Sequence, residues 1–67
     1  MEKKKVKDLA KGEYFILNPI EKPNASQVWV RGAYIREAKK YSTYKWEDTN
    51  HETFRKGDKE VYIGFTF

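Results

Sequence analysis

Apolar and polar residues alternate along residues 27–46, and this alternation is the clearest structural signal in the chain. A period of two places successive side chains on opposite faces of an extended strand. We place a reversal of the chain at residues 38–40, with one extended segment on each side of it. Residues 27–46 therefore predict a β-hairpin.

The parity of its residues divides the hairpin into two faces. We expect one set of side chains to point into the core: Val28, Val30, Tyr34, Tyr44 and Trp46. With the turn at residues 38–40, Arg31 lies opposite Glu47, whereas a slip of two residues would place Arg31 less favourably opposite Lys45. The other set is then left together in solvent: Trp29, Arg31, Ile35, Tyr41 and Lys45.

Two further extended segments flank the hairpin. Residues 13–17 contain aromatic and β-branched side chains and predict a first strand. Residues 61–67 predict a last strand with these side chains inward: Val61, Ile63, Phe65 and Phe67. This last segment is apolar, uncharged and free of proline, so we expect it to be paired internally or across a dimer. Thr49 and Glu52 have the spacing of a capping box and predict one helical turn ending near Phe54.

Together these elements indicate an all-β protein. We expect a small SH3-like antiparallel barrel or a strongly curled sheet of four to five strands, with one short helical turn. An open four-stranded sheet that dimerises to cover its exposed face is the alternative. The 67 residues form a single domain, residues 1–67, because a chain this short has no room for two cores. We expect residues 1–5 to be a flexible basic tail, ordered only if Val6 and Leu9 dock on the core.

The formal net charge of +4 is unevenly distributed and bears on the choice of partner. Residues 31–45 carry five cations against one acid, and the N-terminus adds a run of lysines, whereas residues 46–60 are acidic overall. A polyanion would be attracted to the hairpin and the N-terminus and not to the C-terminal third. The chain has no cysteine, no apolar signal region and no apolar run near the roughly 18 residues that span a bilayer. We therefore expect a cytoplasmic protein with no membrane partner.

The composition offers little material for catalysis. The chain has one histidine, no cysteine and no glycine-rich phosphate loop, so nucleophilic and metal-dependent mechanisms lack their usual residues. His51 lies near Asp48 and Glu52 in the sequence, but a surface imidazole explains it without a catalytic role. Capping and cross-strand pairing explain the nearby acids without a bound cation. We expect no enzyme activity, no cofactor and no metal.

The expected solvent face of the hairpin is the strongest candidate for a binding site. It brings aromatic rings and cations together: Trp29, Arg31, Ile35, Tyr41 and Lys45. Tryptophan, tyrosine and arginine are enriched at protein interfaces, which favours a protein partner or self-association, including a homodimer. The same residue types stack on bases and neutralise phosphates, so single-stranded nucleic acid is the alternative partner. The sequence thus indicates a binding or assembly module whose specific function stays open.

A resemblance adds to this interpretation. It is carried by four short motifs: Val6-Lys7-Asp8-Leu9, Gly12-Glu13-Tyr14-Phe15, Val28-Trp29-Val30-Arg31-Gly32 and Val61-Tyr62-Ile63-Gly64-Phe65. Their order resembles small uncharacterised β proteins of bacterial and phage or mobile-element genomes. The resemblance implies an SH3-like barrel and an accessory role in a mobile element. It implies no activity and no catalytic residue, since SH3-like barrels bind peptides, RNA, DNA or one another.

Overall fold

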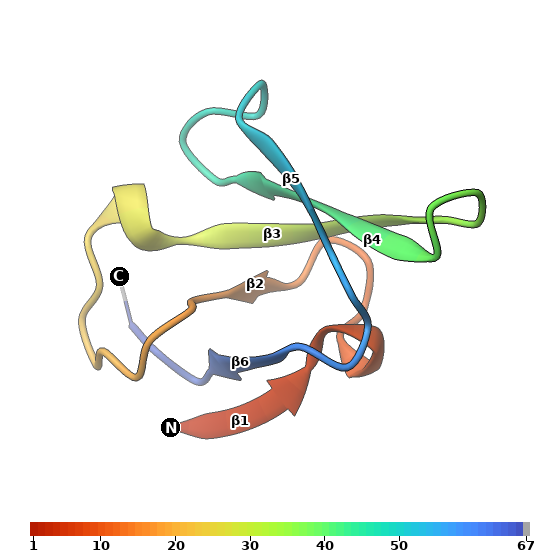
Figure 1. Ribbon diagram of the computed structural model, residues 1–67. Coiled ribbons are helices and arrows are strands. Elements are labelled where there is room, and N and C mark those ends of the chain that lie inside the picture. The colour runs from red at the N-terminus through yellow and green to blue at the C-terminus, as the bar shows by residue number, and fades with distance from the viewer. Residues whose placement is uncertain (67) are drawn as a thin grey trace.

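Strands dominate residues 1–66, the part of the chain that the computed structural model describes (Figure 1). In chain order the elements are β1 (Glu2–Lys5), the 3₁₀ helix η1 (Val6–Asp8), β2 (Tyr14–Phe15), the 3₁₀ helix η2 (Ala25–Gln27), β3 (Trp29–Ile35), β4 (Lys40–Lys45), β5 (Glu52–Arg55) and β6 (Glu60–Ile63). They form two antiparallel sheets, one of β1 and β6 and one in the order β2-β3-β4-β5. The predicted all-β class is therefore confirmed.

A single bridge joins the two sheets. Ile16, just after β2, pairs with Tyr62 of β6 through two backbone hydrogen bonds of 3.0 and 2.9 Å. The neighbouring strands consequently follow one curled path, β1-β6-β2-β3-β4-β5, in which β5 pairs with β4 and leads on to β6 (Figure 1). Within residues 1–66 no strand pairing joins β5 to β1, so a closed barrel is not shown.

The core lies between the two-stranded sheet and the concave face of the four-stranded sheet. Its buried apolar side chains are Val6, Leu9, Phe15, Trp29 and Val61. Trp29 is 7% exposed, so the expectation that it lies in solvent is wrong. The reason is the direction of curl: Phe15 and Trp29 are cross-strand partners, and their shared face is the one that bends toward β6.

The hairpin residues that were expected to point into the core do not form the core cluster around Trp29. Val28 and Val30 are buried as expected, but they lie on the convex face with half-buried Tyr44. Trp46 continues the parity of Tyr44 and is 43% exposed, so it does not build the core. Tyr34, at 46% exposure, is also outside the core.

The β3–β4 hairpin itself is confirmed, with a register different from the predicted one. Arg31 pairs with Thr43 instead of Glu47, and the turn occupies residues 36–39, where Lys39 has a φ of 54°. This shift of four residues preserves parity. A β-bulge between Arg31 and Tyr34 then moves Tyr34 onto the concave face, where its ring lies 4.8 Å from that of Tyr41. Ile35, beyond the bulge, is thereby separated from the other four candidate residues.

Gly32 is the residue that allows this bulge to lie close to β4. A Cβ atom at this position would lie 2.9 Å from the backbone oxygen of Ser42, closer than real Cβ contacts. Glycine is therefore required by the approach of two backbones, because any side chain would force the strands apart.

The N-terminal segment and the residues after β4 correct two further expectations. Residues 2–5 form β1, paired with β6 along its whole length, so they are not a flexible tail. Val6 and Leu9 pack in the core, which was the stated condition for an ordered N-terminal segment. Residues 52–55 are strand β5 and not a helical turn, because their backbone pairs with β4.

The final segment is paired internally, as expected, although β6 is shorter than predicted. β6 has β1 on one side and the bridge to Ile16 on the other, which leaves neither edge of Val61 and Tyr62 open. Val61 is fully buried, Ile63 and Phe65 are half-buried, and Phe67 lies outside the described residues. The first strand, β2, is likewise shorter than residues 13–17. No helix in residues 1–66 is long and apolar enough to cross a membrane.

The two tryptophans should therefore differ sharply in their contribution to stability. Trp29→Ala should lower the free energy of unfolding by about 3–5 kcal/mol, because it opens a cavity in the single core. Trp46→Ala should cost much less, since its ring is largely exposed. Urea denaturation of both variants measures the difference, and equal losses would contradict the placement of the core.

Candidate functional site

The concave face of the four-stranded sheet gathers cations and aromatic rings. Strand register places these residues side by side on it: Trp29, Arg31, Tyr41, Thr43, Lys45 and Arg55. We call this surface the cationic face. It contains four of the five residues that the sequence singled out, so the grouping was predicted correctly, although its position in open solvent was not.

Trp29 is the centre of the cationic face. The Arg55 guanidinium carbon lies 4.5 Å from the ring centroid and the Lys45 ammonium 5.4 Å from it. His51 meets the ring edge-on, with the ring centroids 5.6 Å apart. A cation over an indole is attracted by the negative face of the ring, and this attraction strengthens where water is excluded. Three positively charged or titratable groups therefore cover the edge of the core above Trp29.

Arg55 is held in place by a fully buried threonine. Its Nε donates to Thr43 Oγ1 at 3.1 Å, and Thr43 Oγ1 in turn donates to the backbone oxygen of Thr53 at 2.6 Å. Burial lowers the pKa of the Arg55 guanidinium from its ordinary value. The hydroxyl thus uses both its donor and its acceptor capacity to orient the cation over Trp29.

Arg31 occupies the neighbouring position on β3 and leans toward the hairpin turn. Its guanidinium carbon lies 4.3 Å from the centroid of the Tyr41 ring, and Nη1 donates to the Gly32 oxygen at 2.9 Å. The Nε atom is buried without a hydrogen-bond partner. A buried donor left unpaired is unfavourable, so Arg31 is not placed here by hydrogen bonding alone.

Among the described residues, no acid forms an ion pair with Arg31, Lys45 or Arg55. Within residues 1–66 the ion pair is between Lys3 and Glu60, at 3.8 Å, and it lies in the β1–β6 sheet. Glu52, the acid on β5, is hydrogen-bonded to Ser42 Oγ on the convex face. The cationic face therefore carries uncompensated positive charge.

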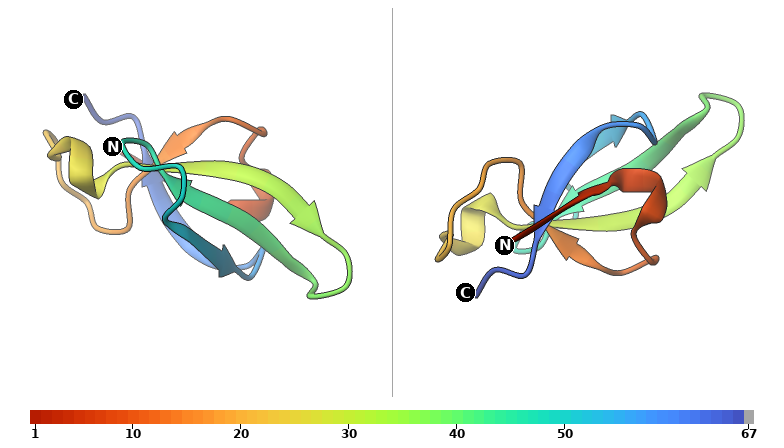
Figure 2. Two further views of the ribbon diagram at one scale, coloured as in Figure 1. Left: turned by 90° about the horizontal axis from the view of Figure 1, so that it is seen from above. Right: turned by 90° about the horizontal axis from the view of Figure 1, so that it is seen from below.

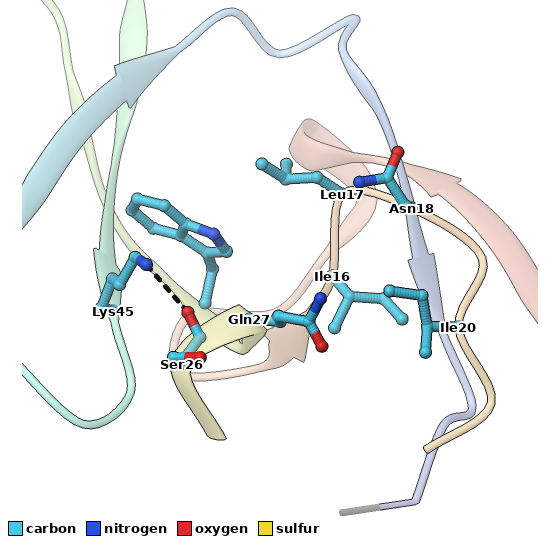
Figure 3. Close-up of a pocket in the computed structure, with 8 residues that line it drawn as sticks. Ile16, Leu17, Asn18, Ile20, Ser26, Gln27 and Lys45 are labelled. Carbon is cyan, nitrogen blue, oxygen red and sulfur yellow. Dashed lines mark hydrogen bonds between the residues drawn. The ribbon is translucent and has the colours of Figure 1, made fainter. Parts of the chain in front are cut away.

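A pocket of about 220 Å³ adjoins the cationic face at the end nearest the β2–β3 loop (Figure 3). Its apolar wall comes from Ile16, Leu17 and Ile20, and the Trp29 ring contributes to its lining. Lys45 reaches across it and donates to the Ser26 backbone oxygen at 2.8 Å (Figure 3). This bond uses one of the three ammonium hydrogens and fixes the direction of the lysine.

The convex face of the same sheet has a different character. Register and parity place Tyr14 and Tyr44 directly beside buried Val30, with Trp46 beyond Tyr44 and Phe54 opposite Ser42 on the edge strand β5. We call Val30 and these four aromatic residues the aromatic face. Tyr14, Trp46 and Phe54 are 42%, 43% and 48% exposed. Glu52 lies on this face beside Tyr44, and its carboxylate already accepts a bond from Ser42. By parity Lys40, at the start of β4, lies on the same face. The aromatic face is therefore mainly apolar, with one acid and one cation beside its rings.

The sequence missed several residues that shape these two faces. Arg55, Thr43 and Phe54 were not singled out. The predicted helical turn concealed the alternation of Phe54 and Arg55 in β5. A strand interpretation of residues 52–55 would have placed Arg55 beside Tyr41 and Phe54 on the opposite face. Tyr14 carried no signal beyond its place in the first strand.

The structure adds no support for a catalytic or metal centre. His51 packs against Trp29, and no group of three or more potential metal ligands forms among residues 1–66. Comparison with known proteins gives no further guidance: no family model, no curated protein and no solved structure matches this chain.

The hydroxyl of Thr43 provides a direct test of this site. Thr43→Val keeps the shape of the side chain but leaves Arg55 Nε and the Thr53 oxygen without their partner, so stability should fall by about 1–3 kcal/mol. The control is Thr53→Val, at the position opposite Thr43 on β5. It should change stability by less than about 0.5 kcal/mol, because Thr43 bonds to the backbone oxygen of Thr53 and not to its hydroxyl. Urea titrations of the pair measure the contrast, and equal effects would exclude this role of Thr43.

Proposed function

We propose that this protein is a small, non-enzymatic assembly module that self-associates by packing the aromatic face against the aromatic face of a second copy. The observation that carries the proposal is the clustering of exposed rings. Five large hydrophobic side chains are exposed in residues 1–66, and three of them, Tyr14, Trp46 and Phe54, belong to this face. A cluster of this kind on one sheet face is typical of an interaction surface.

The charge distribution favours a second copy as the partner. Arg31 and Lys45 lie on the opposite face of the sheet, Arg36 and Lys39 lie at the turn, and only Lys40 among the hairpin cations shares the aromatic face; the protein is basic overall. Two copies that meet through their aromatic faces keep the other hairpin cations apart, so their mutual repulsion is small. The contact would then be isologous, with each ring meeting the same surface on the partner.

The geometry of the sheet is compatible with such a contact. Two twisted sheets pack face to face about 10 Å apart, with strand directions that differ by about 30°. A standard interface buries about 800 Å² on each partner, roughly a fifth of the 4518 Å² surface of one copy. A face of four strands is large enough to supply this area, and the packing would add a second apolar layer to a very small domain.

The finer parts of the proposal concern architecture and compartment. We infer an SH3-like barrel, supported by one curled strand path around one core. We also infer a cytoplasmic protein, supported by the absence of cysteine, since secreted domains of this size usually depend on disulfides.

Phe54 offers the sharpest test of self-association. Sedimentation velocity of the native protein should show a mass rising with concentration from 8.0 kDa toward twice that value. Phe54→Lys should raise the dissociation constant at least about tenfold, because a charge without a partner would be buried in the contact.

The matched control is Tyr34→Lys. Tyr34 has nearly the same exposure as Phe54 and receives the same charge, but it lies on the opposite face of the sheet. Its dissociation constant should be unchanged. A native protein that stays monomeric up to about 1 mM, or equal effects of the two variants, would refute the proposal.

A further inference from the structure

The cationic face has an energetic feature that self-association through the aromatic face leaves unexplained. Arg31, Lys45 and Arg55 are half-buried and lie on three adjacent strands, and in the part of the chain that the structure describes no carboxylate pairs with them. Partly desolvated cations that are not neutralised repel one another. A negatively charged ligand would relieve this repulsion, which makes the cationic face a candidate anion site.

The positive charge continues along the hairpin to its turn. Arg36 and Lys39 are exposed in the turn, with Glu37 as the acid between them. The turn end of β3 and β4 extends beyond the rest of the protein in all three views (Figures 1 and 2). From Lys45 to Tyr41, the cationic side of β4 spans about 14 Å at 3.4 Å per residue, and the turn lies beyond Tyr41. The charge thus forms a stripe longer than a single phosphate or carboxylate would need.

Exposed aromatic surface lies within this stripe. Tyr34 is 46% exposed, and its ring packs against that of Tyr41 with an angle of 53° between the ring planes. The Arg31 guanidinium lies over the Tyr41 ring. One side of the Tyr34 ring is supported by protein, and the ring keeps nearly half of its surface for a ligand. A base can stack on such a ring while cations beside it hold the phosphates.

We propose that the cationic face binds single-stranded nucleic acid, with Arg55 and Lys45 contacting phosphates and Tyr34 stacking on a base. Arg31 lies deeper and contributes its charge from beneath Tyr41, because its Nε is buried. His51, exposed at the edge of Trp29, lies at the end of the stripe. A duplex fits less well, since its bases are not free to stack on Tyr34.

This site is separate from the proposed dimer contact. The two surfaces lie on opposite faces of the β2-β3-β4-β5 sheet, so one can be present without the other. If the protein binds nucleic acid but does not self-associate, this inference stands and the proposed function fails. If it self-associates but does not bind nucleic acid, the proposed function stands and this inference fails.

Fluorescence anisotropy with a labelled 12-nucleotide oligothymidine tests the inference. Binding should appear at low salt and weaken as salt rises, with a logarithmic slope of about −0.7 for each phosphate contact. Arg55→Gln and Lys45→Gln should each remove about one contact from this slope and weaken binding. Tyr34→Ala should weaken binding about fivefold or more with the slope unchanged.

Lys22→Gln is the matched control for charge. Lys22 is an exposed lysine in the β2–β3 loop, away from the stripe, and its loss should leave the slope unchanged. Far-ultraviolet circular dichroism establishes that each variant is folded, and Lys45→Gln tests the site even if Arg55→Gln fails to fold.

Three results would overturn the inference. The first is an absence of oligothymidine binding at low salt. The second is an equal loss for Lys22→Gln and Lys45→Gln, which would indicate attraction by net charge alone. The third is binding of inorganic polyphosphate as tight as that of the oligonucleotide together with no effect of Tyr34→Ala, which would indicate a general polyanion site. Weaker binding of a duplex of the same length would support the proposed single-stranded site.

Discussion

Burial of the Trp29 indole is the interaction on which the rest of the structure depends. Trp29 is the cross-strand partner of Phe15 and belongs to one buried cluster with Val6, Leu9, Phe15 and Val61, so elements from both ends of the chain share its core. A domain this small has one core and loses most of its stability if that core is disrupted. The curl of the sheet determines which of its faces is concave, and Trp29 lies on that face with Phe15.

Trp29 also connects the core to the cationic face. Arg55 and Lys45 lie over a ring that they help to shield, and Thr43 orients Arg55 at the cost of a fully buried hydroxyl. A purely structural cover would use apolar side chains, because half-buried cations without an acid add repulsion and desolvation. The proposed nucleic-acid site would use this positive charge.

The sequence predicted what depends on local alternation and missed what depends on distant contacts. Alternation along residues 27–46 correctly grouped Trp29 with Arg31, Tyr41 and Lys45, because a register shift of four residues preserves parity. Which group faced inward was decided by β1 and β6, whose positions the hairpin sequence does not encode. The bulge at Gly32 depends on the approach of Ser42, and β5 depends on pairing with β4, which overrode the local capping pattern of Thr49 and Glu52.

Acrylamide quenching of Trp29 fluorescence tests the central claim most directly. In a Trp46→Phe variant the emission comes from Trp29 alone, since the chain has two tryptophans. The account predicts a blue-shifted emission and a quenching constant several-fold below that of N-acetyltryptophanamide, with protection lost on unfolding in urea. Quenching of the folded variant as efficient as that of the free amide would contradict it.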